Sequence, residues 1–194
     1  MKKIYSMDKT TFNKILEELN KQIINSFEKN KKLMVCFAGI PGSGKTFLAK
    51  KIEEEFKGVR ISNDNLRKIV EKNIIKDEKQ RDELVREFVF ELLKGWPFKN
   101  ELIILDSGIE RKYEDTKKIA NEKHWKMFII KMVVPKDVII ERIKKKDKER
   151  FEKRPEDIKR WFIEFENFNK KVKADFVFKC NFDLDNLFKK IRNL

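Results

Sequence analysis

The segment with the clearest chemistry is Gly39-Ile40-Pro41-Gly42-Ser43-Gly44-Lys45-Thr46, which satisfies every fixed position of the phosphate-binding pattern G-x-x-x-x-G-K-[ST], the P-loop. Glycines let the backbone curl so that several N–H groups point at phosphate oxygens, and a helix that begins near Lys45 adds the positive end of its dipole. Lys45 would bridge the β- and γ-phosphates, and the Thr46 hydroxyl would bind Mg²⁺. We therefore expect a nucleoside triphosphate to contact Gly39, Pro41, Gly42, Ser43, Gly44, Lys45, Thr46 and the adjoining Phe47.

A second group of reactive side chains follows the next predicted strand, in the stretch from Ser62 to Arg67. Ligands of open parallel sheets lie beyond the carboxyl ends of the strands, so Asp64 should face the nucleotide. There it could accept the proton of an acceptor hydroxyl or orient the water around the metal. Arg67, one helical turn later, could hold an anionic group of the acceptor. The competing interpretation is that Asp64 only caps a helix and that Arg67 is a solvated surface residue.

Asp106 closes an apolar run at residues 102–105, an arrangement typical of a Walker B strand, whose carboxylate helps to hold hydrated Mg²⁺. We interpret Asp106 as a group that binds the metal through water or contacts the acceptor, and Asp64 as the base. The sequence leaves the relative roles of the two carboxylates open, and Asp106 could also be a plain turn residue at the end of a strand.

Three arginines stand out because only ten of the 47 cationic residues are Arg: Arg142, Arg150 and Arg154. A planar, permanently charged guanidinium suits the charge that spreads over a phosphoryl group in its transition state. Pro155 interrupts the helical pattern directly after Arg154, so residues from about 145 to 173 are expected to form a mobile lid and the helix that follows it. The alternative is a solvated basic helix and loop.

A parallel sheet is needed to position these residues, and the pattern predicts one. Short apolar runs predict five strands, at residues 33–38, 58–62, 102–105, 127–134 and 175–180. Helical patterns lie at 45–56, 65–73, 77–94, 111–123, 136–146 and 183–191, with a highly charged stretch at 148–173. This alternation predicts one three-layer α/β/α domain over residues 1–194, with a five-stranded parallel sheet and a helical lid. An amphipathic N-terminal helix within residues 1–31 is expected to pack against the sheet.

Composition bounds the class of protein but not its partner. The length of 194 residues and a hydrophobic content of 40% suit one domain with a real core, and no apolar stretch has the length of a signal peptide or membrane span. We therefore expect a cytoplasmic protein without a membrane partner. The net charge of +14 favours anionic partners only weakly, because the excess Lys is spread over every segment.

Two further side-chain types are expected to be structural. Cys36 and Cys180 lie in predicted strands without metal-ligand spacing, so we expect buried thiols. An aromatic stretch has the spacing of one helix face, which indicates core packing rather than a platform for stacking bases. It comprises Trp161, Phe162, Phe165 and Phe168.

The P-loop followed by Ile61-Ser62-Asn63-Asp64-Asn65-Leu66-Arg67 resembles the P-loop kinases related to the polynucleotide 5′-hydroxyl kinases. The likeness continues through residues 102–108, Val134-Pro135, Glu141-Arg142 and the charged stretch around 150–165. It implies ATP as the phosphate donor, Asp64 as the general base and Arg67 at an acceptor phosphate. It also implies that Arg142 lies near the base and phosphates, and that Arg150 or Arg154 reaches the transferred group. Two departures affect the acceptor side: the family often has Asp-Asp at Asp64-Asn65, and Thr-Asn where this chain has Ser107-Gly108.

The sequence thus predicts an ATP- and Mg²⁺-dependent kinase that phosphorylates a hydroxyl of a nucleic-acid 5′ end or of a nucleotide-like molecule. One alternative keeps the site but changes the acceptor to a small metabolite, a sugar nucleotide or an antibiotic. The other is a nucleotide-binding regulatory NTPase without an acceptor. That class needs a residue that positions water, and no Thr or Gln is convincingly placed for it.

Overall fold

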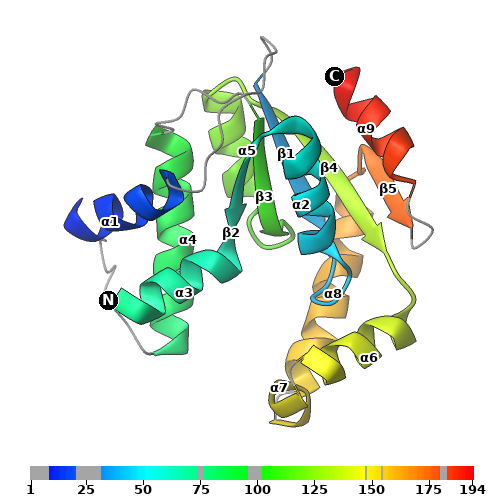
Figure 1. Cartoon of the computed structure of the whole chain (residues 1–194). Helices are drawn as coiled ribbons and strands as arrows, with labels where there is room; N and C mark the ends of the chain where they lie inside the picture. The colour runs from blue at the N-terminus through cyan, green and yellow to red at the C-terminus, as the bar shows by residue number, and fades with distance from the viewer. Residues whose placement is uncertain are drawn as a thin grey trace.

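The structure, a computed structural model, describes residues 9–20, 32–73, 77–95, 102–146, 148–153, 155–179 and 183–194. Its strands are β1 (Leu33–Ala38), β2 (Val59–Ser62), β3 (Leu102–Gly108), β4 (Lys126–Val133) and β5 (Phe176–Lys179). They pair in parallel in the order β2-β3-β1-β4-β5, which places β1 in the middle of the sheet (Figure 1). The predicted parallel sheet of five strands is confirmed.

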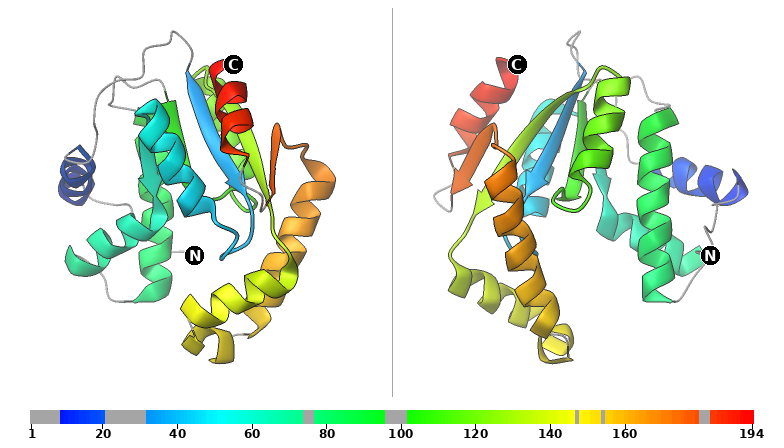
Figure 2. Two further views of the ribbon diagram at one scale, coloured as in Figure 1. Left: turned by 45° about the vertical axis from the view of Figure 1, so that its right-hand side comes forward. Right: turned by 180° about the vertical axis from the view of Figure 1, so that it is seen from behind.

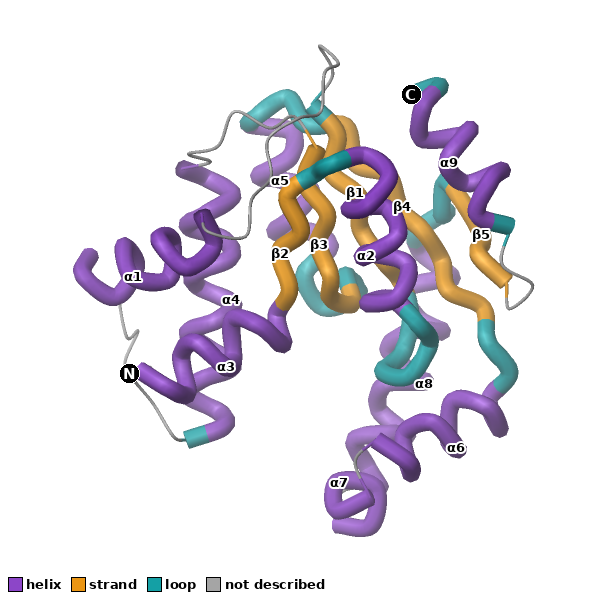
Figure 3. Tube along the Cα trace, viewed as in Figure 1, coloured by secondary structure: helices purple, strands orange, loops and turns teal. Residues whose placement is uncertain are grey.

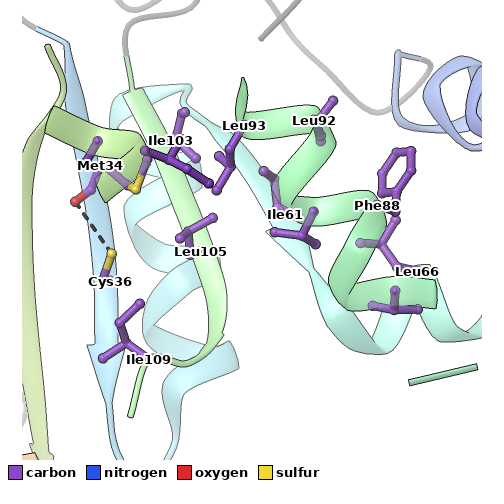
Figure 4. Close-up of a cluster of buried hydrophobic side chains, with 14 of the residues drawn as sticks. Met34, Cys36, Ile61, Leu66, Phe88, Leu92, Leu93, Ile103, Leu105 and Ile109 are labelled. Atoms are coloured by element: carbon purple, nitrogen blue, oxygen red, sulfur yellow. Dashed lines mark hydrogen bonds between the residues drawn. The ribbon is translucent and has the colours of Figure 1, made fainter. Parts of the chain in front are cut away.

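Helices cover both faces of this sheet, because successive side chains of a strand point to opposite faces and every residue of β1 is buried. The odd-numbered side chains of β1 pack with α2 (Lys45–Phe56) and α9 (Leu184–Arg192). The even-numbered side chains, of which Figure 4 labels Met34 and Cys36, face the second layer. The right-hand view of Figure 2 shows the helices of this layer in front of the sheet. That layer contains α4 (Glu78–Gly95), α5 (Tyr113–Glu122) and α8 (Pro155–Lys171).

The N-terminal helix α1 (Lys9–Asn20) does not pack directly on the strands, so that prediction is wrong. Phe12 contacts Phe88 of α4, with ring centroids 5.0 Å apart, and α1 also touches α3 (Asn63–Asn73). Figure 1 shows α1 beside these two helices and away from the strands. Because α4 already covers that face of the sheet, the apolar stripe of α1 is buried against the helical layer instead. Residues 21–31 lie outside the described residues.

The remaining boundaries differ from the predicted ones by local causes. Helix α3 begins at Asn63, two residues early, because the Ser62 hydroxyl accepts a bond from the Asn65 N–H at 3.4 Å and caps the helix. Ser62, not Asp64, therefore has the capping role. The charged stretch forms α7 (Lys148–Lys153), and Pro155 begins α8, as proline does in a first helical turn.

Two expectations about apolar segments can be compared with the structure. Cys36 is fully buried in β1, and its thiol donates to the Met34 carbonyl at 3.9 Å (Figure 4). Cys180 lies outside the described residues. Among the helices that the structure describes, none is long and apolar enough to cross a membrane.

Candidate active site

The P-loop connects β1 to α2 in a conformation that depends on its glycines. Gly42 and Gly44 have φ angles of 85° and 95°, in the left-handed region that other residues rarely adopt. Gly39 is required for space, since a Cβ there would lie 2.7 Å from Ser43 Oγ and 2.8 Å from Met132 Cβ. Helix α2 begins directly at Lys45, so the free N–H groups of its first turn lie at the loop.

Lys45 and Ser43 show that this loop suits an anion. The Lys45 ammonium donates to the carbonyls of Gly39 and Ile40, at 2.6 and 2.9 Å, and so folds back on its own loop. Burial lowers the pKa of Lys45, while the charges of Glu110, Asp106 and Asp64 oppose that shift. The Ser43 hydroxyl is buried and has no hydrogen-bond partner among the described residues. The phosphates of a nucleotide would place negative charge next to the Lys45 ammonium and would give the Ser43 hydroxyl a hydrogen-bond partner.

Asp106, at the end of β3, is fixed through both carboxylate oxygens. The Thr46 hydroxyl donates to Oδ1 at 2.9 Å, and Arg60 of β2 donates to Oδ2 at 2.9 Å. Arg60 is held in turn by Glu53 of α2, at 2.5 Å. The side chains of Asp106 and Arg60 are only 2% and 12% exposed, so this is a buried, ordered ion pair. It places a carboxylate beside the Thr46 hydroxyl.

The residues present fit Mg²⁺ only as a partner of nucleotide phosphates. No group of three His, Cys, Asp or Glu side chains in the described part of the chain could hold a metal ion alone. Mg²⁺ normally keeps several waters and binds through one or two protein oxygens and substrate phosphates. The Thr46 hydroxyl and, through water, the Asp106 carboxylate supply that donor set.

Asp64 and Arg67 lie together in the first turns of α3, on one face of the helix. Arg67 donates to Asp64 Oδ1 at 2.8 Å and to Asp82 of α4 at 2.6 Å. The Asp64 side chain is 59% exposed, and the Lys146 ammonium lies 3.9 Å from its second oxygen. Lys146 ends α6 (Lys136–Lys146), so Asp64 lies where α3 and the predicted lid approach each other.

The predicted lid is joined to the P-loop through an apolar cluster. Ile40 of the loop packs with Ile139 and Ile143 of α6 and with Ile158 of α8. Figures 1 and 3 show α6 and α7 across the P-loop from α3. The aromatic stretch is packed as predicted. Trp161, Phe162 and Phe165 border this cluster, and Phe168 belongs to the main core.

The structure describes some of the remaining predicted site residues more completely than others. Arg142 of α6 donates to the Gly42 carbonyl at 3.2 Å, so it touches the P-loop itself. Phe47 lies in the first turn of α2 and is 46% exposed. Arg150 belongs to α7, but its side chain lies outside the described residues, as does the whole of Arg154. The roles of these four residues stay predictions.

Two site residues were not identified from the sequence, Arg60 and Glu110. The Gly39 N–H donates to Glu110 Oε1 at 2.5 Å, and burial raises the pKa of Glu110. Glu110 thus brings negative charge to the base of the P-loop, beside Lys45. A signal for Arg60 was present: a cation inside an apolar strand needs a buried partner.

The chain can be compared with known proteins by sequence and by fold. The sequence profile of the AAA domain family matches residues 34–166. No curated protein sequence matches the chain at a significant level. A solved chain of the PezAT toxin–antitoxin system of Streptococcus pneumoniae has a TM-score of 0.65 and 13% identity, over 90% of this chain and 77% of that one.

Two further solved structures cover nearly the whole of their own chains. A candidate kinase from Chloroflexus aurantiacus has a TM-score of 0.58 and 13% identity, over 84% of this chain and 98% of that one. The APS kinase CysC of Mycobacterium tuberculosis, in complex with AMPPNP and APS, has a TM-score of 0.54 and 14% identity, over 85% and 98%. These likenesses show that the fold is that of the P-loop kinases. The chain, matched over residues 34–166, belongs to the AAA domain family.

Proposed function

We propose that this chain is a cytoplasmic, ATP- and Mg²⁺-dependent kinase that transfers the γ-phosphate to a hydroxyl of a nucleic-acid 5′ end or of a nucleotide-like acceptor. In this proposal residues 1–194 act as one P-loop kinase domain, and the segment from about 145 to 173 is its lid. The observation that carries the proposal is a P-loop with carboxylates beside it: Asp106 accepts the Thr46 hydroxyl at 2.9 Å, and the charges of Asp106 and Asp64 oppose the lowering of the Lys45 pKa by burial. Lys45 follows β1, Asp64 follows β2, and Asp106 lies in β3 near its carboxyl end, where ligands of such sheets bind.

In the proposed reaction, Oδ2 of Asp64 is the proton acceptor. The acceptor oxygen forms a bond to the γ-phosphorus, its proton passes to Asp64 Oδ2, and the bond from the γ-phosphorus to the bridging oxygen of ADP breaks. Arg67 holds Oδ1 and so orients the carboxylate. Lys45 exchanges its two loop carbonyls for oxygens of the β- and γ-phosphates.

The metal and the lid complete the proposed site. Mg²⁺, when bound, would offset the charge of the β- and γ-phosphates. Thr46 would hold it directly and Asp106 through water, and the buried pair with Arg60 keeps Asp106 in place for this. Arg142 already contacts the P-loop, and we assign Arg150 and Arg154 to the charge on the transferred group.

Two alternatives keep part of this site. A kinase for a small metabolite, a sugar nucleotide or an antibiotic is favoured by one likeness of fold, to the APS kinase solved with AMPPNP and APS. A regulatory NTPase without an acceptor would use the P-loop alone. It would leave the Asp64–Arg67 pair without a chemical role.

A transfer assay separates these functions. We would incubate the protein with Mg²⁺ and γ-labelled ATP, and offer 5′-hydroxyl DNA and RNA oligonucleotides, nucleotides, sugar nucleotides and an antibiotic panel. Label should pass to an oligonucleotide or nucleotide. Asp64→Asn should reduce this transfer about a hundredfold or more, because it removes the base. The control is Asp185→Asn, at an exposed carboxylate in the first turn of α9.

Each competing outcome has its own signature. Label on metabolites or antibiotics alone would replace the acceptor class but keep the kinase. Steady ATP hydrolysis that no acceptor changes, with Asp64→Asn as active as the wild type, would overturn the kinase in favour of the regulatory NTPase.

A further inference from the structure

Strand β3 is irregular at its carboxyl end, and this irregularity brings Glu110 to the P-loop. The first four residues of β3 pair with β1 in steady register, but Phe37 then pairs with Gly108, so residues 106–107 have no counterpart in β1. The Ile109 N–H donates to the Phe37 carbonyl at 2.9 Å. The chain is thereby held against β1 at the residue before Glu110.

Gly39 connects Glu110 to Lys45. Its N–H donates to Glu110 Oε1 at 2.5 Å, and its carbonyl accepts the Lys45 ammonium at 2.6 Å. Burial lowers the pKa of Lys45, and among the charges that oppose this shift Glu110 has the largest effect. Since Gly39 is the first residue of the P-loop, the carboxylate fixes the point from which the loop starts and, through it, the resting position of its lysine.

Gly108 leaves the space that the Glu110 carboxylate occupies. A Cβ at position 108 would lie 2.5 Å from Glu110 Oε2, whereas the next nearest atoms, Glu110 Cδ and the Gly39 oxygen, would lie at ordinary contact distances of 3.5 and 3.6 Å. Gly108 does not have a positive φ, so its backbone would accept other residues. The chain departs from the family pattern here, since that pattern often has Asn at this position. Glycine at 108 and glutamate at 110 therefore form a matched pair.

The place of Glu110 is unfavourable for a carboxylate. Burial raises the pKa of Glu110, and the negative charge of Glu164 on α8 adds to this rise. Hydrogen bonds from backbone N–H groups and the charge of Lys45 oppose the rise without cancelling it. An uncharged side chain would avoid this conflict, and such conflicts persist mainly where function requires them. The fold alone gives no reason for a glutamate here.

We propose that Glu110 is a positioning residue for the P-loop: through its bond to Gly39 it holds the loop and Lys45 in the arrangement that receives the triphosphate. This inference rests on the proposed function and concerns its nucleotide half. In the proposed reaction Lys45 leaves the Gly39 carbonyl for phosphate oxygens, while the Gly39 N–H stays on Glu110 and keeps the loop in place. A group that orients a binding loop before the ligand arrives strengthens the binding of that ligand.

Nucleotide binding to two uncharged variants isolates this role. We would titrate the full chain with AMPPNP in the presence of Mg²⁺ by calorimetry. Glu110→Gln and Glu110→Ala remove the same charge, but Gln keeps an oxygen that can accept the Gly39 N–H and Ala does not. Glu110→Ala should therefore bind AMPPNP about tenfold more weakly than Glu110→Gln, since a displaced loop loses hydrogen bonds to charged phosphates, whereas equal affinities would overturn the proposal. The control, Glu122→Ala at the exposed last residue of α5, should bind like the wild type.

Gly108→Ala gives a second test, which keeps the charge of Glu110. The atom that its Cβ would displace is the end of a flexible side chain, so the fold should persist while the carboxylate moves off Gly39. Gly108→Ala should weaken AMPPNP binding about tenfold in the wild-type background. It should change nothing in the Glu110→Ala background, where the displaced oxygen is missing. The same loss in both backgrounds would show that residue 108 acts independently of Glu110, which would contradict the assignment.

Phosphoryl transfer separates the positioning of the donor from contact with the acceptor. With ATP and a 5′-hydroxyl oligonucleotide, Glu110→Ala should have a kcat about tenfold to a hundredfold below that of Glu110→Gln, because a small displacement of reacting groups can cost that much. The KM of the oligonucleotide should be the same in both variants. A higher KM in Glu110→Ala, with equal affinity for AMPPNP, would assign Glu110 to the acceptor and overturn the proposal.

The failure of this inference differs from the failure of the proposed function. A wild type that does not bind AMPPNP would contradict the proposed function itself, and this inference with it. Equal AMPPNP affinities in the Gln and Ala variants would remove the role of Glu110 and leave the kinase standing. A wild type that binds AMPPNP but transfers no phosphate would contradict the kinase, whereas the titrations would still decide whether Glu110 positions the loop.

Discussion

Replacing Lys112, the half-buried N-cap residue of α5, by Met should stabilise the protein. The pKa of Lys112 falls from its ordinary value of 10.5 to about 8 in the folded chain. This difference corresponds to about 3 kcal/mol of unfavourable free energy when both folded and unfolded chains carry the proton. Solvent reaches part of the half-buried side chain and screens its charge, which leaves about 1–2 kcal/mol. Met keeps the apolar stem and carries no charge. We therefore expect the free energy of unfolding at pH 7 to rise by that amount.

The gain in stability from Lys112→Met depends on pH. Between pH 8 and 10.5 the unfolded chain binds the Lys112 proton more tightly than the folded chain, so wild-type stability rises with pH there relative to the variant. The advantage of Lys112→Met should be complete below pH 8 and absent above 10.5. Calorimetry at pH 7 should show a melting temperature about 3–6 °C higher, and urea unfolding at pH 7 and 10 should show the loss of the gain. The control is Lys118→Met, which removes the same charge from an exposed position on α5 and so measures the general effect of losing one lysine. Lower stability of Lys112→Met at pH 7, or an equal gain at both pH values, would refute this reasoning.

Three further changes probe the P-loop and its supports. Lys45→Ala should reduce phosphoryl transfer from labelled ATP at least about a hundredfold with the fold retained by circular dichroism, and an active variant would refute the P-loop assignment. Asp106→Ala should lower the free energy of unfolding in urea by about 3 kcal/mol, because it leaves Arg60 without one partner of a buried pair; Glu53→Ala, at a more exposed carboxylate, should cost about 1 kcal/mol. Equal losses would contradict the central place of Asp106. Glu110→Gln should stabilise the protein at pH 7 but not at pH 4, since burial raises the pKa of Glu110 and wild-type stability falls as the pH rises through that value. A gain that persists at pH 4 in urea unfolding would argue against a charge effect.

The local parts of the fold could be predicted from the sequence, because each follows from short-range physics. The bounds of α2 and α6 match the predicted ones, since a Gly-rich loop, a proline and an apolar period mark them within a few residues. The buried strands were visible as continuous apolar runs for the same reason. Even the Asp64–Arg67 contact follows from a spacing of three residues in a helix.

The long-range parts could not be predicted in this way. The Arg60–Asp106 pair joins residues 46 apart, and the Glu110 contact to Gly39 joins residues 71 apart. Both depend on which strands are neighbours, and that order is not encoded in a local period. The error about α1 has the same origin. An amphipathic pattern shows that one face of a helix is buried, but not which layer buries it.

The cations of the site differ in what they already contact. This difference distinguishes cations that hold a carboxylate in place from cations that could bind an anionic ligand. Arg60 and Arg67 are held by carboxylates, so they fix Asp106 and Asp64 before any substrate is present. Among the described residues, Lys45 donates hydrogen bonds to backbone carbonyls alone and Lys112 makes no ion pair, so an anion would give Lys45 or Lys112 a stronger contact. Both also carry a pKa lowered by burial, which is an unfavourable condition for a folded chain to maintain. Local conflicts of this kind persist mainly where function requires them, and Lys45 lies in the loop to which our proposal assigns the phosphates of the nucleotide.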